Sequence, residues 1–106
     1  LNLGDSARAH AAELIRMLGE HPDLSPALRL SALTQASVAH SYDQQYRAEA
    51  EELAIQALQV ARQAFGEVHA EAAYAGMRLA AVLRIKGDVP AARPHAQRAA
   101  ELARQV

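Results

Sequence analysis

The sequence predicts an all-α fold made of antiparallel helical pairs. Apolar residues recur at steps of three and four along most of the chain, which places them on one face of a helix. Ala and Leu supply most of the apolar content and favour helices, whereas Val and Ile, which favour strands, are sparse. The length of 106 residues, with 51% hydrophobic residues, suits one folded domain spanning residues 1–106.

The first predicted helix covers residues 5–18. Its apolar stripe begins with Ala7 and Ala11. Asp5 is of a type that commonly caps a helix N-terminus. Gly19 follows the stripe directly and is expected to end the helix, because glycine readily adopts the left-handed conformation of a C-cap.

The second and third predicted helices cover residues 25–42 and 46–65. Ser25 followed by Pro26 is typical of an N-cap with proline in the first helical position. The third helix has the longest apolar stripe of the chain. That stripe consists of Tyr46, Ala50, Leu53, Ala54, Ala57, Leu58, Ala61, Ala64 and Phe65.

The fourth and fifth predicted helices cover residues 70–86 and 89–105. Gly66 and Gly87 each follow an apolar stripe and are expected to end the third and fourth helices. Asp88 is placed to cap the fifth helix. The short connections between these segments predict that neighbouring helices run antiparallel.

The composition argues against several classes of function. The formal net charge is −1, without the basic excess of a nucleic-acid-binding domain. There is no Cys for a disulfide or a thiolate, no apolar run of about 20 residues for a membrane span, and no signal-peptide pattern. We therefore expect a cytoplasmic protein that contacts neither nucleic acid nor membrane.

Two features of the sequence suggest its context. The chain opens on Leu1, in the run "LNLGDSARAH", and we expect it to be a fragment of a longer protein. Lys86 is the single lysine among 11 basic residues, and this preference for Arg, together with abundant Ala, is associated with GC-rich bacterial genomes.

No cluster of chemically active residues follows a known catalytic or metal-binding spacing. The five His residues show no i, i+4 pair on one helix and have no Cys to complete a zinc set. Ser37 and Ser41 share a helix with His40, but a serine triad also needs an orienting acid and an oxyanion hole. The five Gly are scattered, so no phosphate-binding loop exists. We expect no catalytic residue, no cofactor and no metal.

The sequence repeats internally with a period of 42 residues. This register aligns Ala50 with Ala92 and Ala57 with Ala99. The runs "LGEHPD" and "FGEVHAE", which follow the first and third helices, also correspond, with one residue deleted from the first. Such a period is the signature of a helical repeat array.

From Gly76 onward the chain resembles the tetratricopeptide repeat family. Leu79, Ala80 and Leu83 stand where the family has Leu, Gly and Tyr, and Gly87 stands in the turn. The 42-residue spacing and the "LGEHPD" loop are similar to the kinesin-light-chain variety, which is also common in bacterial regulators.

The resemblance has departures. Gly76 replaces the usual Trp of the first helix, and Ala96 replaces the Phe of the second. The middle repeat has Gln44 and Gln45 in place of the turn glycine and carries an extra residue near Tyr46.

The resemblance implies a right-handed α–α superhelix of stacked helix–turn–helix repeats. It divides the chain into a half repeat at residues 1–22 and full repeats at residues 23–66 and 67–106. It also implies a scaffold that binds another protein or a peptide in a concave groove. The alternatives are a regulatory or self-association module of a larger bacterial signalling or transcription-regulating protein, joined through uncapped ends, and an enzyme or metal protein built on a helical bundle.

A helical wheel selects the residues of this groove on the first helix of each repeat. Arg78 and Arg84 on or beside this face predict an acidic peptide ligand, because Arg binds carboxylates well. The competing interpretation is that this face merely covers the array. The predicted groove residues are Ser31, Thr34, Gln35, Val38, Ser41, Tyr42, Tyr74, Met77, Arg78, Ala81 and Arg84.

Overall fold

A computed structural model describes residues 3–41 and 44–105. Helices are the only regular secondary structure in those ranges, and short connections join them. Each α-helix begins and ends within two residues of its predicted bounds, which confirms the all-α prediction. The elements are α1 (Leu3–Glu20), α2 (Pro26–Ser41), the 3-10 turn η1 (Gln44–Tyr46), α3 (Arg47–Phe65), α4 (Ala70–Lys86) and α5 (Val89–Gln105).

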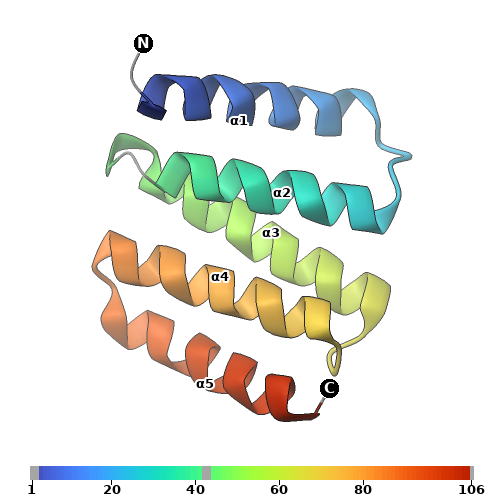
Figure 1. Cartoon of the computed structure of the whole chain (residues 1–106), viewed down its shortest axis with the longest axis vertical. Coiled ribbons are helices and arrows are strands. Elements are labelled where there is room, and N and C mark those ends of the chain that lie inside the picture. Colours follow the sequence, from blue (N-terminus) through green and yellow to red (C-terminus); the bar gives the residue numbers. More distant parts are fainter. Residues whose placement is uncertain (1–2, 42–43, 106) are drawn as a thin grey trace.

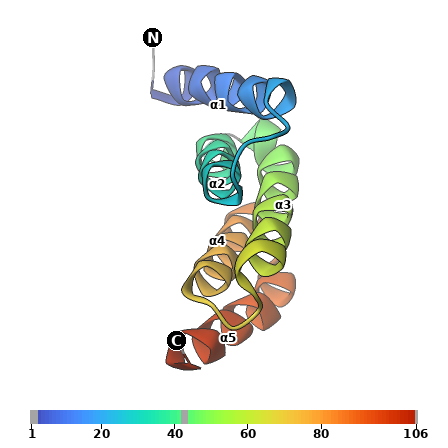
Figure 2. The same ribbon diagram turned by 90° about the vertical axis from the view of Figure 1, so that its right-hand side faces the viewer.

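The helices form an open stack in which each packs against the next along the chain (Figure 1). α1 and α5 lie at opposite ends of the stack (Figure 1). α2 and α4 also contact each other directly, on the side of the stack away from α3 (Figure 2). The molecule measures 42 × 35 × 17 Å, so its thinnest dimension is less than two helix diameters.

Side-chain caps begin α2 and α5 as the sequence predicts. Ser25 Oγ accepts a hydrogen bond from the Leu28 amide at 3.3 Å, and Pro26 occupies the first helical position. Asp88 Oδ1 accepts from the Ala91 amide at 3.2 Å. Each cap provides an acceptor for an amide that has no partner within its helix.

Glycine ends α3 and α4, as predicted. Gly66 and Gly87 both have a φ of 98°, a backbone conformation that other residues rarely adopt. Two predictions about α1 were wrong. The helix begins at Leu3, so Asp5 lies within the first turn, and it continues through Gly19 to Glu20.

The 42-residue register is visible in the helix boundaries. α3 begins at Arg47 and α5 begins at Val89, which are 42 residues apart. The 3-10 turn η1 immediately precedes α3, where the sequence indicates an extra residue near Tyr46.

Small side chains dominate the core. Of the 22 buried hydrophobic residues among those described, 14 are Ala, seven are Leu and one is Val. Alanine allows helix backbones to approach closely, and the leucines fill the remaining space. Gly76 on α4 lies close to α5: a Cβ added to Gly76 would lie 3.6 Å from Ala99 Cβ and 3.9 Å from the carbonyl oxygen of His95.

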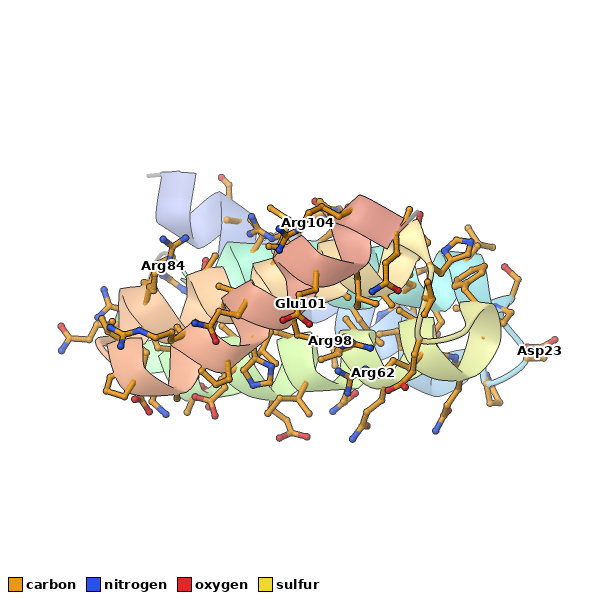
Figure 3. All side chains as sticks on the ribbon, turned by 90° about the horizontal axis from the view of Figure 1, so that it is seen from below. Asp23, Arg62, Arg84, Arg98, Glu101 and Arg104 are labelled. Carbon is orange, nitrogen blue, oxygen red and sulfur yellow. The ribbon has the colours of Figure 1, made fainter. Side chains whose placement is uncertain are left out.

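Some positions that are buried on α3 are exposed at the equivalent places on α5, the last helix of the stack. On α3, Ala54, Leu58 and Ala61 are buried. The corresponding residues of α5 are Ala96, Ala100 and Ala103, and all three are exposed. Figure 3 views the stack from this end, where Arg98 and Glu101 form an ion pair on α5 at 3.4 Å.

Charged side chains pair on the exposed surface of α1. Arg16 donates hydrogen bonds to Glu13 and to Glu20, the latter at 2.7 Å. The hydrogen bond and charge of Arg16 hold the pKa of Glu13 below its usual value. Because all three side chains are exposed, we expect these pairs to contribute little to stability.

We predict that Gly76→Ala stabilises the protein by about 0.5–1 kcal/mol, because alanine is a better helix former and restricts the unfolded chain. The distances around the added Cβ are ordinary van der Waals contacts. Urea denaturation measures the change. A loss of stability would mean that α4 and α5 lie closer together than described.

Ala99→Leu should destabilise the protein by about 1–3 kcal/mol, because a larger side chain overpacks the contact with α4. Ala99 is only 1% exposed. Ala96→Leu on the same helix is the matched control and should change stability by less than about 0.5 kcal/mol, since Ala96 is exposed. Equal denaturation midpoints for the two variants would contradict the register.

Candidate functional site

The exposed surface shared by α2 and α4, here called the α2–α4 face, carries large side chains that the core does not use. Tyr74 and Met77 on α4 are 53% and 55% exposed, and Ile85 is also exposed. Ser31 and Gln35 are exposed on α2, beside the half-buried Thr34. Aromatic, apolar and hydrogen-bonding groups therefore lie together on one surface.

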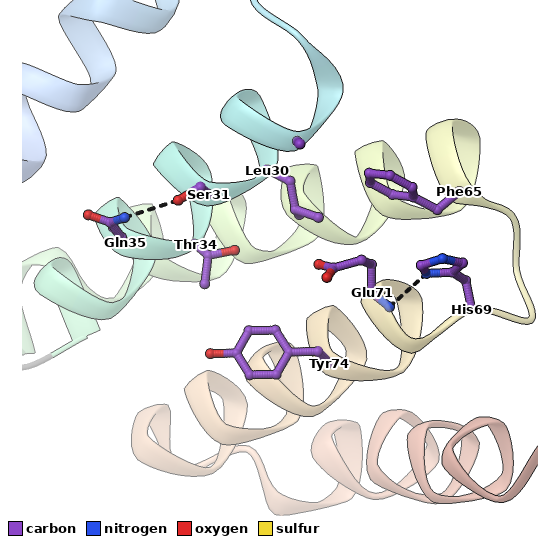
Figure 4. A pocket seen from close by; sticks show the side chains of 9 residues that line it. Leu30, Ser31, Thr34, Gln35, Phe65, His69, Glu71 and Tyr74 are labelled. Atoms are coloured by element: carbon purple, nitrogen blue, oxygen red, sulfur yellow. Dashed lines mark hydrogen bonds between the residues drawn. The ribbon is translucent and has the colours of Figure 1, made fainter. Parts of the chain in front are cut away.

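A hollow of about 560 Å³ lies on this face. It runs between the first halves of α2 and α4, and the end of α3 and the connection into α4 close one end (Figure 4). The residues that line it are Ala27, Leu30, Ser31, Thr34, Gln35, Phe65, His69, Glu71 and Tyr74.

One wall of the hollow is apolar. Leu30 is buried, whereas Phe65 is half-buried and contributes its ring from the last turn of α3. The rings of Phe65 and His69 stack with their centroids 5.2 Å apart and their planes inclined at 26°. Tyr74 lies across the hollow from α2 (Figure 4). Such surfaces suit the apolar part of a ligand.

Three of the residues that α2 contributes to the hollow are polar: Ser31, Thr34 and Gln35. Gln35 Nε2 donates a hydrogen bond to Ser31 Oγ at 3.0 Å. Gln35 Oε1 accepts a long hydrogen bond from His10 Nε2 on α1, at 3.5 Å. Thr34 supplies a further hydroxyl (Figure 4). These side chains therefore offer both donors and acceptors to a ligand backbone.

His69 is the N-cap of α4. Its Nδ1 accepts a hydrogen bond from the Glu71 amide at 3.0 Å (Figure 4). An imidazole nitrogen that accepts a hydrogen bond carries no proton, so the ring is neutral in this arrangement. Stacking against Phe65 and capping of α4 together fix the ring at the edge of the hollow.

Four of the eleven predicted groove residues line the hollow: Ser31, Thr34, Gln35 and Tyr74. Val38, Met77, Arg78, Ala81 and Arg84 do not line it. Ser41 is buried, and its hydroxyl donates to the Val38 carbonyl at 2.7 Å. Tyr42 lies outside the described residues.

The two arginines that led us to predict an acidic ligand lie outside the hollow. Arg78 is half-buried, and its buried Nε has no hydrogen-bond partner among the described residues. Arg84 is exposed, two turns nearer the end of α4 than Met77. The charged residue that does line the hollow is Glu71.

Sequence reasoning missed Ala27, Leu30, Phe65, His69 and Glu71. The helical wheel compared residues only within the first helix of each repeat, whereas Phe65 and His69 come from the end of α3 and the connection that follows it. A signal for His69 was present, because it directly precedes the helix predicted to begin at residue 70, where an N-cap belongs.

Among residues 3–41 and 44–105, no group of three His, Asp or Glu side chains is arranged to hold a metal ion. No helix in the described part of the chain is long and apolar enough to cross a membrane.

Comparison with known protein families gives a match over the middle of the chain. Residues 29–71 match a family model described as "Tetratricopeptide repeat". These 43 residues run from the first turn of α2 through α3 to the first turn of α4, so they include most residues of the hollow. No curated protein and no solved structure matches the chain.

We predict that His69→Ala destabilises the protein by about 1 kcal/mol, because the Glu71 amide loses its acceptor. His69→Asn should be more stable than His69→Ala, since an Asn side chain can accept from the same amide. Both variants lose the stacking on Phe65, so the difference between them isolates the cap. Equal stability of the two variants in urea denaturation would show that the cap contributes nothing.

Proposed function

We propose, from the match of residues 29–71 to a tetratricopeptide repeat model, that the chain is a protein-interaction module that binds a peptide segment of its partner along the α2–α4 face. Stacked helical repeats create extended surfaces that proteins of this kind use for binding. The proposal adds a particular face, and a particular hollow on that face, to the general role of such repeats.

The observation that carries the proposal is the hollow together with the exposed side chains around it. Tyr74 and Met77 expose more than half of their surfaces, although large apolar side chains are normally buried. Tyrosine provides a rigid contact area at low entropic cost, and methionine adapts to different partners. The hollow next to them has room for one or two peptide side chains.

A peptide crossing this face would meet three kinds of group. The apolar wall formed by Leu30 and Phe65 would bury a side chain. The Gln35–Ser31 hydrogen bond on α2 could be exchanged for bonds to the peptide backbone. Arg78, farther along α4, is half-buried, and the exposed part of its guanidinium could meet a carboxylate of the same peptide. The acidic residue that the sequence analysis expected in the ligand would then bind at Arg78, outside the hollow.

The test is a pull-down from a lysate of the source cells with the domain carrying Tyr74→Ala and Gln35→Ala. Both residues are exposed, so the variant should fold, which circular dichroism can check. The control carries Gln56→Ala and Gln63→Ala, at exposed positions of α3. We expect partners retained by the control to be lost by the α2–α4 variant, because truncating a central aromatic anchor commonly costs over about 1 kcal/mol.

The opposite result would exclude this face. If both variants retain the same partners at the same affinity, binding must use another surface.

A further inference from the structure

The hollow on the α2–α4 face contains one ionised side chain. Of its lining residues only Glu71 carries a full charge, since His69 is neutral while its Nδ1 accepts a hydrogen bond. The Glu71 carboxylate is exposed and forms no hydrogen bond or ion pair within the described residues. Figure 4 shows this carboxylate extending from α4 into the hollow, between Phe65 and Tyr74.

The surroundings of Glu71 suit a long cationic side chain. Phe65 and Tyr74 provide aromatic rings on either side, and ring faces attract cations. Leu30 provides an apolar surface for an aliphatic stem. Thr34 adds a hydroxyl oxygen that can accept a hydrogen bond from the cationic group.

A second hollow, between α3 and α5, differs from the first because its charged side chains have partners within the protein. Its volume is about 410 Å³, and it is lined in part by Glu51, Lys86 and Asp88. Lys86 Nζ donates to Glu51 at 2.8 Å, and this contact raises the pKa of Lys86. Asp88 caps α5. These charges are occupied by partners in the protein, whereas the charge of Glu71 is not.

An acidic side chain would be poorly placed in the first hollow. It would face Glu71 directly, and like charges repel. The positive end of the α4 dipole weakens this repulsion but does not reverse the charge of a full carboxylate. An acidic residue of the peptide therefore belongs farther along α4, toward Arg78.

We infer that the hollow receives a lysine or arginine side chain of the bound peptide, with Glu71 as its charge partner. The inference rests on the proposed function and names the anchor residue of the ligand. Arginine fits better than lysine, because its planar guanidinium can bond a carboxylate through two donors while stacking on an aromatic ring.

The experiment selects peptides from a random-sequence phage library on the 106-residue protein, then measures the best synthetic peptide by fluorescence anisotropy. Selected peptides should share one Arg or Lys position. Replacing that residue by citrulline, which keeps the shape of arginine without its charge, should weaken binding about 5- to 10-fold. The peptide change leaves the protein unaltered, so folding cannot explain the loss.

Glu71→Gln should weaken the arginine peptide by a similar factor and remove its advantage over the citrulline peptide. Glu67→Gln is the matched control, because Glu67 is exposed nearby but does not line the hollow. It should bind both peptides as the parent does.

The remaining outcomes separate the two proposals. Peptides that lose binding with Tyr74→Ala but have no basic residue, or that bind Glu71→Gln as well as the parent, would overturn the basic anchor and leave the proposed binding face standing. If no selected peptide is sensitive to Tyr74→Ala, both proposals fail.

Discussion

The close approach of neighbouring helices at alanine and glycine positions is the constraint on which the rest of the structure depends. Gly76 and Ala99 bring α4 and α5 together, and buried alanines serve the same purpose along α2, α3 and α4. Because the side chains at these contacts are small, successive helices lie close together, and α2 and α4 also touch although they are not consecutive in the chain. The hollow exists because α2 and α4 lie side by side while the end of α3 and the following connection close the space between them.

Most of the fold could be predicted from the sequence, because local signals and the repeat agree. Ser25, Asp88 and the glycines at 66 and 87 mark helix ends through hydrogen bonds and backbone conformations that depend on nearby residues alone. The end of α1 was predicted two residues too early, because glycine is tolerated in the last turn of a helix and α1 continues through Gly19 to Glu20. The alanines that the repeat register aligns between α3 and α5 are buried at Ala92 and Ala99, whereas Ala96 is exposed and has no neighbouring helix among the described residues.

The site was less predictable, because a helical wheel finds a face but does not say what lies opposite it. The wheel placed Tyr74 and Arg78 on one side of α4, yet only Tyr74 reaches the hollow. Glu71 lies in the first turn of α4, where a carboxylate commonly favours the helix N-terminus, so the sequence does not single it out. The role we propose for it at the hollow depends also on Phe65, which comes from the preceding helix and lines the same space. The charge expected of the ligand depends on this three-dimensional arrangement rather than on the count of arginines in the helix.

The packing of each helix mainly against its neighbours in the chain has a mechanical consequence. The walls of the hollow belong to α2 and α4, and both are carried by α3 (Figure 2). A small rotation of α2 or α4 about its contact with α3 would change the distance between the two walls of the hollow. The alanines and leucines of these interfaces are close-packed, so such a rotation has to move several side chains together. A ligand gripped by both walls would therefore stiffen the middle of the stack, and its affinity would depend on the elasticity of the whole array as well as on the atoms it touches.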